Sequence, residues 1–301
     1  MQKLNMSRRK MMLNSARAVA GLSLAGIMSS CRSGSGDLAG DKMLKKGFRI
    51  GACDWSLGKS SDAGSFEVAR RLELDGVQVN AGMVGEELHL SSPEVQKTFL
   101  KAAEDNGMEI ASLCLLQLNG IPYKSNPLAE RWVVDSIEIC REMKVKVVMI
   151  PCFGKGDILD DEKGVDVVVE RLKQAAPKAE KAGVVIGLES LLSAEQHMDI
   201  IDRVGSGAVK VYYDLGNAHK KGYDIYKEIR FLGSRNICEF HAKDYNNLFG
   251  QGKIDFPRVR LAMDDIGYHG LIQIEGATPL GLEASYRHDG QYLKSIFPRE
   301  V

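Results

Sequence analysis

Four residues that bind metals or move protons stand at regular intervals in the second half of this 301-residue chain. Each closes a short apolar run: Glu189 after VVIGL, Asp214 after VKVYY, His241 after ICEF and Glu275 after LIQI. Their separations of 25, 27 and 34 residues each match the length of one strand and one helix. Taken singly, each is explained by a helix cap or a surface ion pair. Four in register predict a shared site.

The chemistry of such a site follows from its charges. Three carboxylates brought together would repel one another and raise one another's pKa unless a cation neutralised them. A set of two Glu, one Asp and one His is rich in oxygen, so it favours Mn²⁺, Co²⁺ or Mg²⁺ over the cysteine-rich sites of structural zinc. The sequence therefore predicts one divalent metal ion at this site.

The elements that must position these residues are short apolar runs alternating with longer segments of helical period, such as 93–106, 127–143, 165–182 and 194–204. That alternation is typical of parallel βα units. The predicted strands are 48–53, 76–80, 109–115, 146–151, 184–189, 209–214, 237–243 and 271–276. Eight units in about 250 residues predict a (β/α)8 TIM barrel, whose active site lies at the C-terminal ends of the strands.

The alternative fold is an open, doubly wound sheet. It would place a Gly-x-Gly-x-x-Gly turn after the first strand, and the sequence GACDW at 51–55 contains none. No internal repeat indicates a second domain. We therefore expect a single TIM-barrel domain over residues 46–301.

The N-terminus has the features of an export signal. Residues 1–31 combine a basic start with an uncharged stretch that is too short to span a bilayer, and a Gly/Ser-rich linker follows at 32–45. SRRKMML at 7–13 is similar to a twin-arginine motif. MSSC at 28–31 is similar to a lipoprotein cleavage box, in which Cys31 would be acylated. These patterns predict a cell-envelope location, periplasmic or membrane-anchored. An ordinary cleaved signal, in which Cys31 has no role, is the alternative.

Charge and cysteine content narrow the function further. Removing the signal removes five basic residues and leaves 35 basic against 40 acidic ones, which argues against a nucleic-acid partner. The five cysteines after Cys31 show no Cys-x-x-Cys spacing, so they are interpreted as small buried core residues.

The motifs GLES at 187–190, YYDLGN at 212–217, HAKD at 241–244, GQGKID at 250–255 and IE at 274–275 occur in this order. In this order they resemble the sugar phosphate isomerase/epimerase family with the xylose-isomerase-like barrel, which includes tagatose and psicose epimerases. The resemblance covers about residues 46–298. It implies that Glu189, Asp214, His241 and Glu275 bind the metal, commonly manganese, and that the two glutamates also move protons.

Two positions depart from the epimerase pattern. Asn217 stands where those ketose epimerases often have His, and Asn247 stands where they often have Arg. Asn can hydrogen-bond a sugar hydroxyl, but it cannot carry a proton at neutral pH. Glu195 matches a family glutamate that contacts substrate, or alternatively it starts a helix through a favourable dipole interaction.

Three further side chains are candidates for substrate contact. Trp55 is expected to stack on a sugar or else to plug the barrel mouth. Lys243 and Gln78 are expected to bind hydroxyls or a phosphate, or else to make structural bonds.

These observations predict a metal-dependent sugar isomerase or epimerase that transfers a proton next to a carbonyl through an enediolate, with a small sugar as substrate. Two alternatives stay open: a lyase or hydratase on 3-keto sugars or glycosides, and a non-catalytic sugar-binding envelope lipoprotein. A DNA-repair endonuclease of the same superfamily would need a His-rich cluster of several metals and a basic face. It is disfavoured, because this chain offers one convincing His ligand and more acidic than basic residues after the signal.

Overall fold

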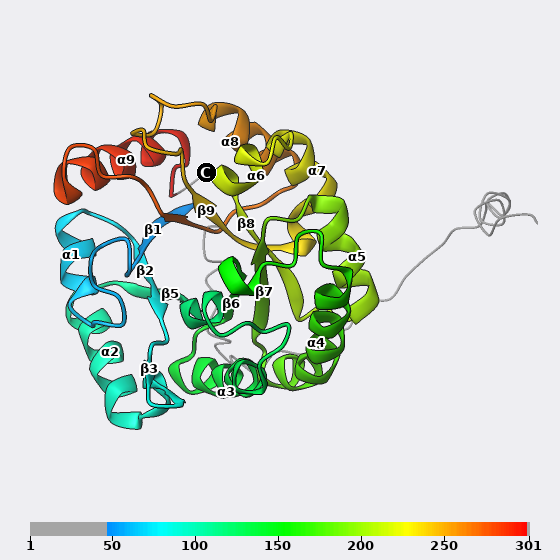
Figure 1. The fold of residues 1–301 in the computed structure, drawn as a ribbon. Helices are drawn as coiled ribbons and strands as arrows, with labels where there is room; N and C mark the ends of the chain where they lie inside the picture. The colour runs from blue at the N-terminus through cyan, green and yellow to red at the C-terminus, as the bar shows by residue number, and fades with distance from the viewer. Residues whose placement is uncertain (1–46, 300–301) are drawn as a thin grey trace, which may run out of the picture. The chain divides into compact units, whose positions relative to one another are not determined.

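The computed structural model describes residues 47–299, and they form a closed barrel of eight parallel strands (Figure 1). Around the barrel the strand order is β1-β10-β9-β8-β7-β6-β5-β2, and β1 pairs with β10 to close it. The barrel strands are β1 (Arg49–Cys53), β2 (Gly76–Asn80), β5 (Glu109–Cys114), β6 (Val147–Cys152), β7 (Val185–Ser190), β8 (Val209–Asp214), β9 (Ile237–Ala242) and β10 (Leu271–Ile274).

Helices connect successive strands and form a ring outside the barrel (Figure 1). They are α1 (Ser65–Arg71), α2 (Pro93–Asp105), α3 (Pro127–Met143), α4 (Glu162–Ala182), α5 (Ala194–Val204), α7 (Ile225–Asn236), α8 (Phe256–Asp265) and α9 (Leu282–Ile296). The short α6 (Leu215–Lys220) follows β8 directly and packs on β9. A small hairpin of β3 (Met83–Val84) and β4 (Glu87–Leu88) follows β2, and three short 3-10 helices are η2 (His89–Ser91), η3 (Leu116–Asn119) and η4 (Gly154–Gly156).

The strands form because their residues are apolar on both faces, as parallel strands covered by helices require. All residues of β2 and β6 are buried. The helices begin where the sequence provides caps. Asn126 accepts a hydrogen bond from the Leu128 amide ahead of Pro127, and Ser193 with Gln196 forms a reciprocal capping box at the start of α5. A cap of this kind is worth about 1 kcal/mol.

Parallel closure brings the C-terminal ends of all eight strands to one rim. Asp214 is both the last residue of β8 and the N-cap of α6, and Glu275 follows directly after β10. The barrel thus positions residues that lie far apart in the sequence.

The predicted TIM barrel is confirmed, and the doubly wound alternative is wrong because β1 and β10 pair and leave no open edge. β2 and β8 have the expected boundaries, and the other strands differ from expectation by one or two residues at an end, as when β10 ends at Ile274 rather than at 276. Four of the five cysteines after Cys31 are buried, as expected, and Cys238 is half-buried.

The predicted export signal, linker and Cys31 lipidation site lie outside the described residues. Among residues 47–299, no helix is both long enough and apolar enough to cross a membrane.

Candidate metal centre

The four predicted ligands meet at the C-terminal rim of the barrel. One ligand atom from each of Glu189, Asp214, His241 and Glu275 lies within 4.8 Å of the others. The His241 Nδ1 atom is 3.0 Å from Glu189 Oε1, 3.6 Å from Glu275 Oε2 and 4.0 Å from Asp214 Oδ2. Glu189, Asp214 and His241 are at most 4% exposed, so water screens the interactions between their charges only weakly.

The ring of His241 is held from behind. Its Nε2 lies 2.7 Å from Gln78 Oε1 and 3.4 Å from Cys53 Sγ, so an Nε2–H donates to Gln78 and Nδ1 is left to face the carboxylates. A bond of this kind to the non-ligating nitrogen fixes the ring of a metal-binding histidine. Gln78 therefore makes the structural bond that the sequence left as an alternative to substrate binding.

The electrostatics of His241 reflect the acidic surroundings. Burial by itself lowers the pKa of the imidazole, but Glu189, Glu275 and Asp214 outweigh burial and raise the pKa of His241 to about 8. The three carboxylates therefore favour the protonated form of the imidazole.

Two of the carboxylates have one oxygen engaged by other groups. Asp214 Oδ1 accepts a hydrogen bond from the Asn217 backbone amide at 2.8 Å, which starts α6. Glu275 Oε1 accepts one from Trp55 Nε1 at 2.9 Å. The other oxygens, Asp214 Oδ2 and Glu275 Oε2, face His241 and the Lys243 ammonium.

The two glutamates have different protonation behaviour. Burial raises the pKa of Glu189 to about 7, although His241 opposes this shift. Burial acts in the same direction on Glu275, but the Lys243 ammonium and His241 prevail and hold the pKa of Glu275 below its ordinary value. The centre therefore combines a carboxyl group that can hold a proton with one that stays ionised.

These residues fit a hard divalent ion. The buried Oδ2 of Asp214 accepts no hydrogen bond of acceptable geometry within the described part of the chain, although Lys243 Nζ lies 3.0 Å away as an ion pair. A buried oxygen without a hydrogen bond is rare and indicates a missing partner such as an ion. Three carboxylates and one imidazole form a donor set that Mn²⁺, Co²⁺ and Mg²⁺ prefer.

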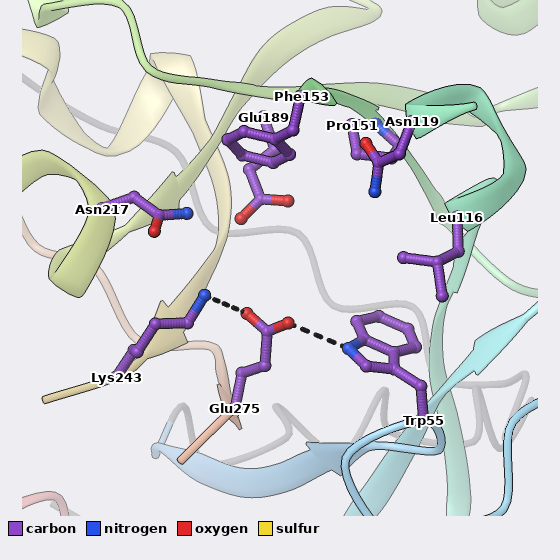
Figure 2. A pocket seen from close by; sticks show the side chains of 9 residues that line it. All are labelled: Trp55, Leu116, Asn119, Pro151, Phe153, Glu189, Asn217, Lys243 and Glu275. Carbon is purple, nitrogen blue, oxygen red and sulfur yellow. Dashed lines mark hydrogen bonds and ion pairs between the residues drawn. The ribbon is translucent and has the colours of Figure 1, made fainter. Parts of the chain in front are cut away.

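A cavity of about 280 Å³ opens beside the centre (Figure 2). It is lined by Trp55, Leu116, Asn119, Pro151, Phe153, Glu189, Asn217, Lys243 and Glu275. Glu189 and Glu275 face each other across it, and the amides of Asn217 and Asn119 reach in from two sides (Figure 2). The structure thus places Trp55, Asn217 and Lys243 around this cavity, and their contact with a substrate stays a prediction.

Sequence reasoning missed the wall formed after β5 and β6. Leu116 and Asn119 belong to η3, while Pro151 and Phe153 lie at the end of β6. The available signal was a polar residue in a loop after a predicted strand, and Asn119 meets that description. It was not separable from other loop residues without knowing how η3 packs.

Glu195, which the sequence predicted to contact substrate or to start a helix, lies apart from the cavity. Its side chain is exposed in the first turn of α5, directly after the Ser193 capping box, and it does not line the cavity. The structure agrees with the alternative in which Glu195 favours the helix start through the helix dipole.

Comparison with known proteins places the chain in a family. Residues 66–296 match the xylose isomerase-like TIM barrel family, and the chain belongs to it. It is 25% identical over 177 residues to a 2-epi-5-epi-valiolone 7-phosphate 2-epimerase of Actinoplanes sp., a match that covers 58% of this chain and 65% of the relative. It is 28% identical over 116 residues to a D-psicose 3-epimerase of Enterocloster bolteae, covering 36% and 38%. Both matches therefore span less than two thirds of the relative.

Solved structures show the same fold at low identity. D-psicose 3-epimerase from Clostridium cellulolyticum H10 superposes with a TM-score of 0.71 at 18% identity, covering 84% of this chain and all of that one. The 3-keto-D-glucoside 4-epimerase of E. coli gives a TM-score of 0.68 at 13% identity, covering 82% and 99%.

Proposed function

We propose that this protein is a divalent-metal-dependent sugar isomerase or epimerase that moves a proton at a carbon next to a carbonyl. The observation that carries the proposal is the placement of two glutamates, Glu189 from β7 and Glu275 after β10, on opposite sides of one cavity beside Asp214 and His241. Two carboxylates on opposite sides can remove a proton from one face of a carbon and return one to the other face. The epimerase relatives support the same reaction class.

Each residue has a distinct task in this proposal. Glu189, Asp214, His241 and Glu275 would hold the ion, with manganese as the first choice for this oxygen-rich set. When bound, such an ion polarises a carbonyl and stabilises the negative charge that develops on its oxygen. Trp55 fixes the orientation of Glu275 through its Nε1–H, and His241 is fixed by Gln78.

The cavity supports a small, uncharged sugar as substrate. Lys243 is the only basic residue among the described residues that line it, and it already pairs with two carboxylates. With one divalent ion, this lysine balances the three carboxylates, so a phosphate dianion would bring charge that nothing compensates. Asn119 and Asn217 can both donate to and accept from hydroxyls.

The apolar part of the cavity wall supports the same class of substrate. Trp55, Leu116 and Phe153 offer apolar surface that suits the C–H face of a sugar ring. The backbone carbonyl of Asn119 packs closely against Gly154, because a Cβ at Gly154 would lie 3.0 Å from it.

The deciding experiment is exchange of substrate hydrogen in deuterated water. Full-chain protein loaded with Mn²⁺ is incubated with D-fructose, D-tagatose and D-psicose, and NMR follows deuterium at the carbons next to the carbonyl. We expect exchange with at least one sugar and its loss after EDTA treatment. Absence of exchange with every sugar at saturating concentration would contradict the proposed reaction and favour a binding protein. The product then separates epimerisation from loss of water.

We also propose that the protein is exported and that its mature chain begins at or near Cys31, on the strength of the N-terminal pattern alone. Intact-mass analysis of protein purified from the native envelope tests this. A mature pool that retains Met1 would overturn it.

A further inference from the structure

Lys243 occupies an unusual position for a substrate-binding lysine, because it contacts the metal centre itself. Its Nζ lies 2.6 Å from Glu275 Oε2 and 3.0 Å from Asp214 Oδ2. Figure 2 shows the ammonium turned toward Glu275 at the edge of the cavity. The side chain is 26% exposed, so the cation is largely removed from water but still borders the cavity.

The oxygens that Lys243 contacts are the ones that remain for a metal. Asp214 Oδ1 already accepts from the Asn217 amide and Glu275 Oε1 from Trp55. The remaining oxygens, Oδ2 and Oε2, also face His241 Nδ1, at 4.0 and 3.6 Å. The ammonium and a divalent ion would therefore draw on the same two oxygens.

The two cations are poorly compatible in that place. A divalent ion requires carboxylate oxygens at roughly 2.0–2.3 Å, and a positive charge within about 4 Å of it is strongly repelled in a buried site. The lysine ammonium also has space into which it can move. A Cβ at Gly216 would lie 2.8 Å from Lys243 Cβ and 2.9 Å from its Cγ, so the stem is confined at its base by α6, whereas the terminal ammonium borders open space.

We propose that Lys243 is the resident counter-cation of the metal-free centre, and that a divalent ion binds only as the ammonium withdraws from Asp214 and Glu275 into the cavity. The lysine thereby compensates the buried carboxylates before the ion arrives. It also lowers the apparent metal affinity to the intrinsic affinity multiplied by the fraction of protein in which the ammonium has withdrawn. After withdrawal, the ammonium is available to a substrate hydroxyl. This inference rests on the metal centre of the proposed function, but not on any particular sugar.

The substitution Lys243→Met tests the proposal, because Met keeps the apolar stem and removes the charge. EDTA-stripped full-chain protein is titrated with Mn²⁺ by calorimetry. We expect Lys243→Met to bind Mn²⁺ roughly 10- to 100-fold more tightly than wild type. Lys253→Met is the charge-matched control, since Lys253 is exposed, lies over the Tyr245 ring and makes no ion pair with the four ligands. It should change Mn²⁺ affinity by less than about twofold, as expected for a screened surface charge.

The direction of the change in Mn²⁺ affinity distinguishes a competing lysine from one that stabilises the ligands. If Lys243 merely stabilised the ligands, its loss would weaken or leave unchanged the affinity for Mn²⁺, and either result overturns the proposal. Wild-type protein that binds no Mn²⁺ would remove the metal centre and this inference together. Normal Mn²⁺ binding by wild type without tighter binding by Lys243→Met removes the inference alone.

A second measurement does not depend on the variant folding. In a crystal structure of Mn²⁺-loaded wild-type protein, we expect Lys243 Nζ to lie beyond hydrogen-bond distance, roughly 3.5 Å, of both Asp214 Oδ2 and Glu275 Oε2. Retention of either contact beside a bound ion would overturn the proposal.

Discussion

The two halves of the barrel rim differ in the groups that they bring to the same cavity. Strands β7, β8 and β9 and the end of β10 contribute the charged residues Glu189, Asp214, His241 and Glu275. The rim of β1, β5 and β6 contributes Trp55, Leu116, Asn119 and Phe153, which carry no charge. One half is therefore built to hold an ion and move protons, and the other half to contact a neutral molecule.

The halves also differ in how they tolerate a buried carboxylate. In the charged half, Glu275 is compensated by Lys243 and His241, and its pKa falls. In the other half, Asp54 is fully buried next to Trp55 and accepts only backbone amides, from Ser61 and Asn80, both at 2.9 Å. Burial raises the pKa of Asp54 to about 7. Burial also raises the pKa of Glu189 to about 7 although His241 opposes the shift, so the Lys243 ammonium beside Glu275 is the feature that keeps that carboxylate ionised.

The largest effect should come from the charged half. Glu189→Gln and Glu275→Gln should each lower substrate C–H exchange by about 10²–10⁴, because an amide has no useful basicity near pH 7. Part of the metal affinity should survive through the amide oxygen. Exchange is measured on variants shown by elemental analysis to be fully metallated.

Glu239→Gln is the matched control for these variants. Glu239 is also a buried barrel glutamate, but it bonds to Tyr212 and Ser112 and does not line the cavity beside the metal centre. It should retain exchange. Wild-type exchange by either metallated Glu189→Gln or Glu275→Gln would show that the acid/base pair is misassigned.

The next effect concerns pH and stability in the neutral half. Since the folded-state pKa of Asp54 is raised from 3.8 to about 7, the folded state binds the extra proton between these values and loses stability as pH rises through them. Asp54→Asn should remove about 2–3 kcal/mol of the loss between pH 5 and pH 8. Urea unfolding at both pH values measures it.

Asp105→Asn is the control for Asp54→Asn, because Asp105 is an exposed carboxylate at the end of α2 that pairs with Lys101. It should leave the pH dependence of the unfolding free energy as in wild type. An identical pH slope in Asp54→Asn and wild type would mean that Asp54 stays ionised when buried.

The boundary between the halves is the hydrogen bond from Trp55 to Glu275. Trp55→Phe keeps the aromatic wall and removes the Nε1–H, so the maximal exchange rate should fall roughly tenfold with little change in the sugar concentration required. Trp55→Ala removes both and should also raise that concentration. Steady-state kinetics of the two variants separate the roles, and an unaffected rate in Trp55→Phe would show that the bond does not orient Glu275 for catalysis.

The smallest effect should come from the amides. Asn119→Ala and Asn217→Ala should each raise KM about three- to tenfold, the contribution of one hydrogen bond, and spare most of kcat. The cap of α6 survives in Asn217→Ala, because its bond to Asp214 uses the backbone amide. Asn236→Ala, at the end of α7 before β9 begins, is the control. Kinetics equal to this control would exclude Asn119 from substrate binding.

The sequence accounts for the barrel, its strands and the meeting of four ionisable residues at one rim. Apolar runs of strand length in alternation with helical periods specify parallel βα units, and a polar residue at the end of such a run must lie at the shared rim. Glu189, Asp214, His241 and Glu275 could therefore be predicted together from spacing alone, and Trp55 and Asn217 from their places just beyond a strand.

The loops, side-chain directions and ion pairs around these residues depend on tertiary packing. Asn119 and Phe153 belong to loops whose course depends on how η3 packs against η4, where glycines allow close approach, and no local pattern encodes that contact. Glu195 illustrates the converse, since its spacing matched a substrate contact but the helix start turned its side chain to solvent. The pairing of Lys243 with the ligand carboxylates likewise depends on side-chain direction at distances of a few ångströms, which strand spacing does not determine.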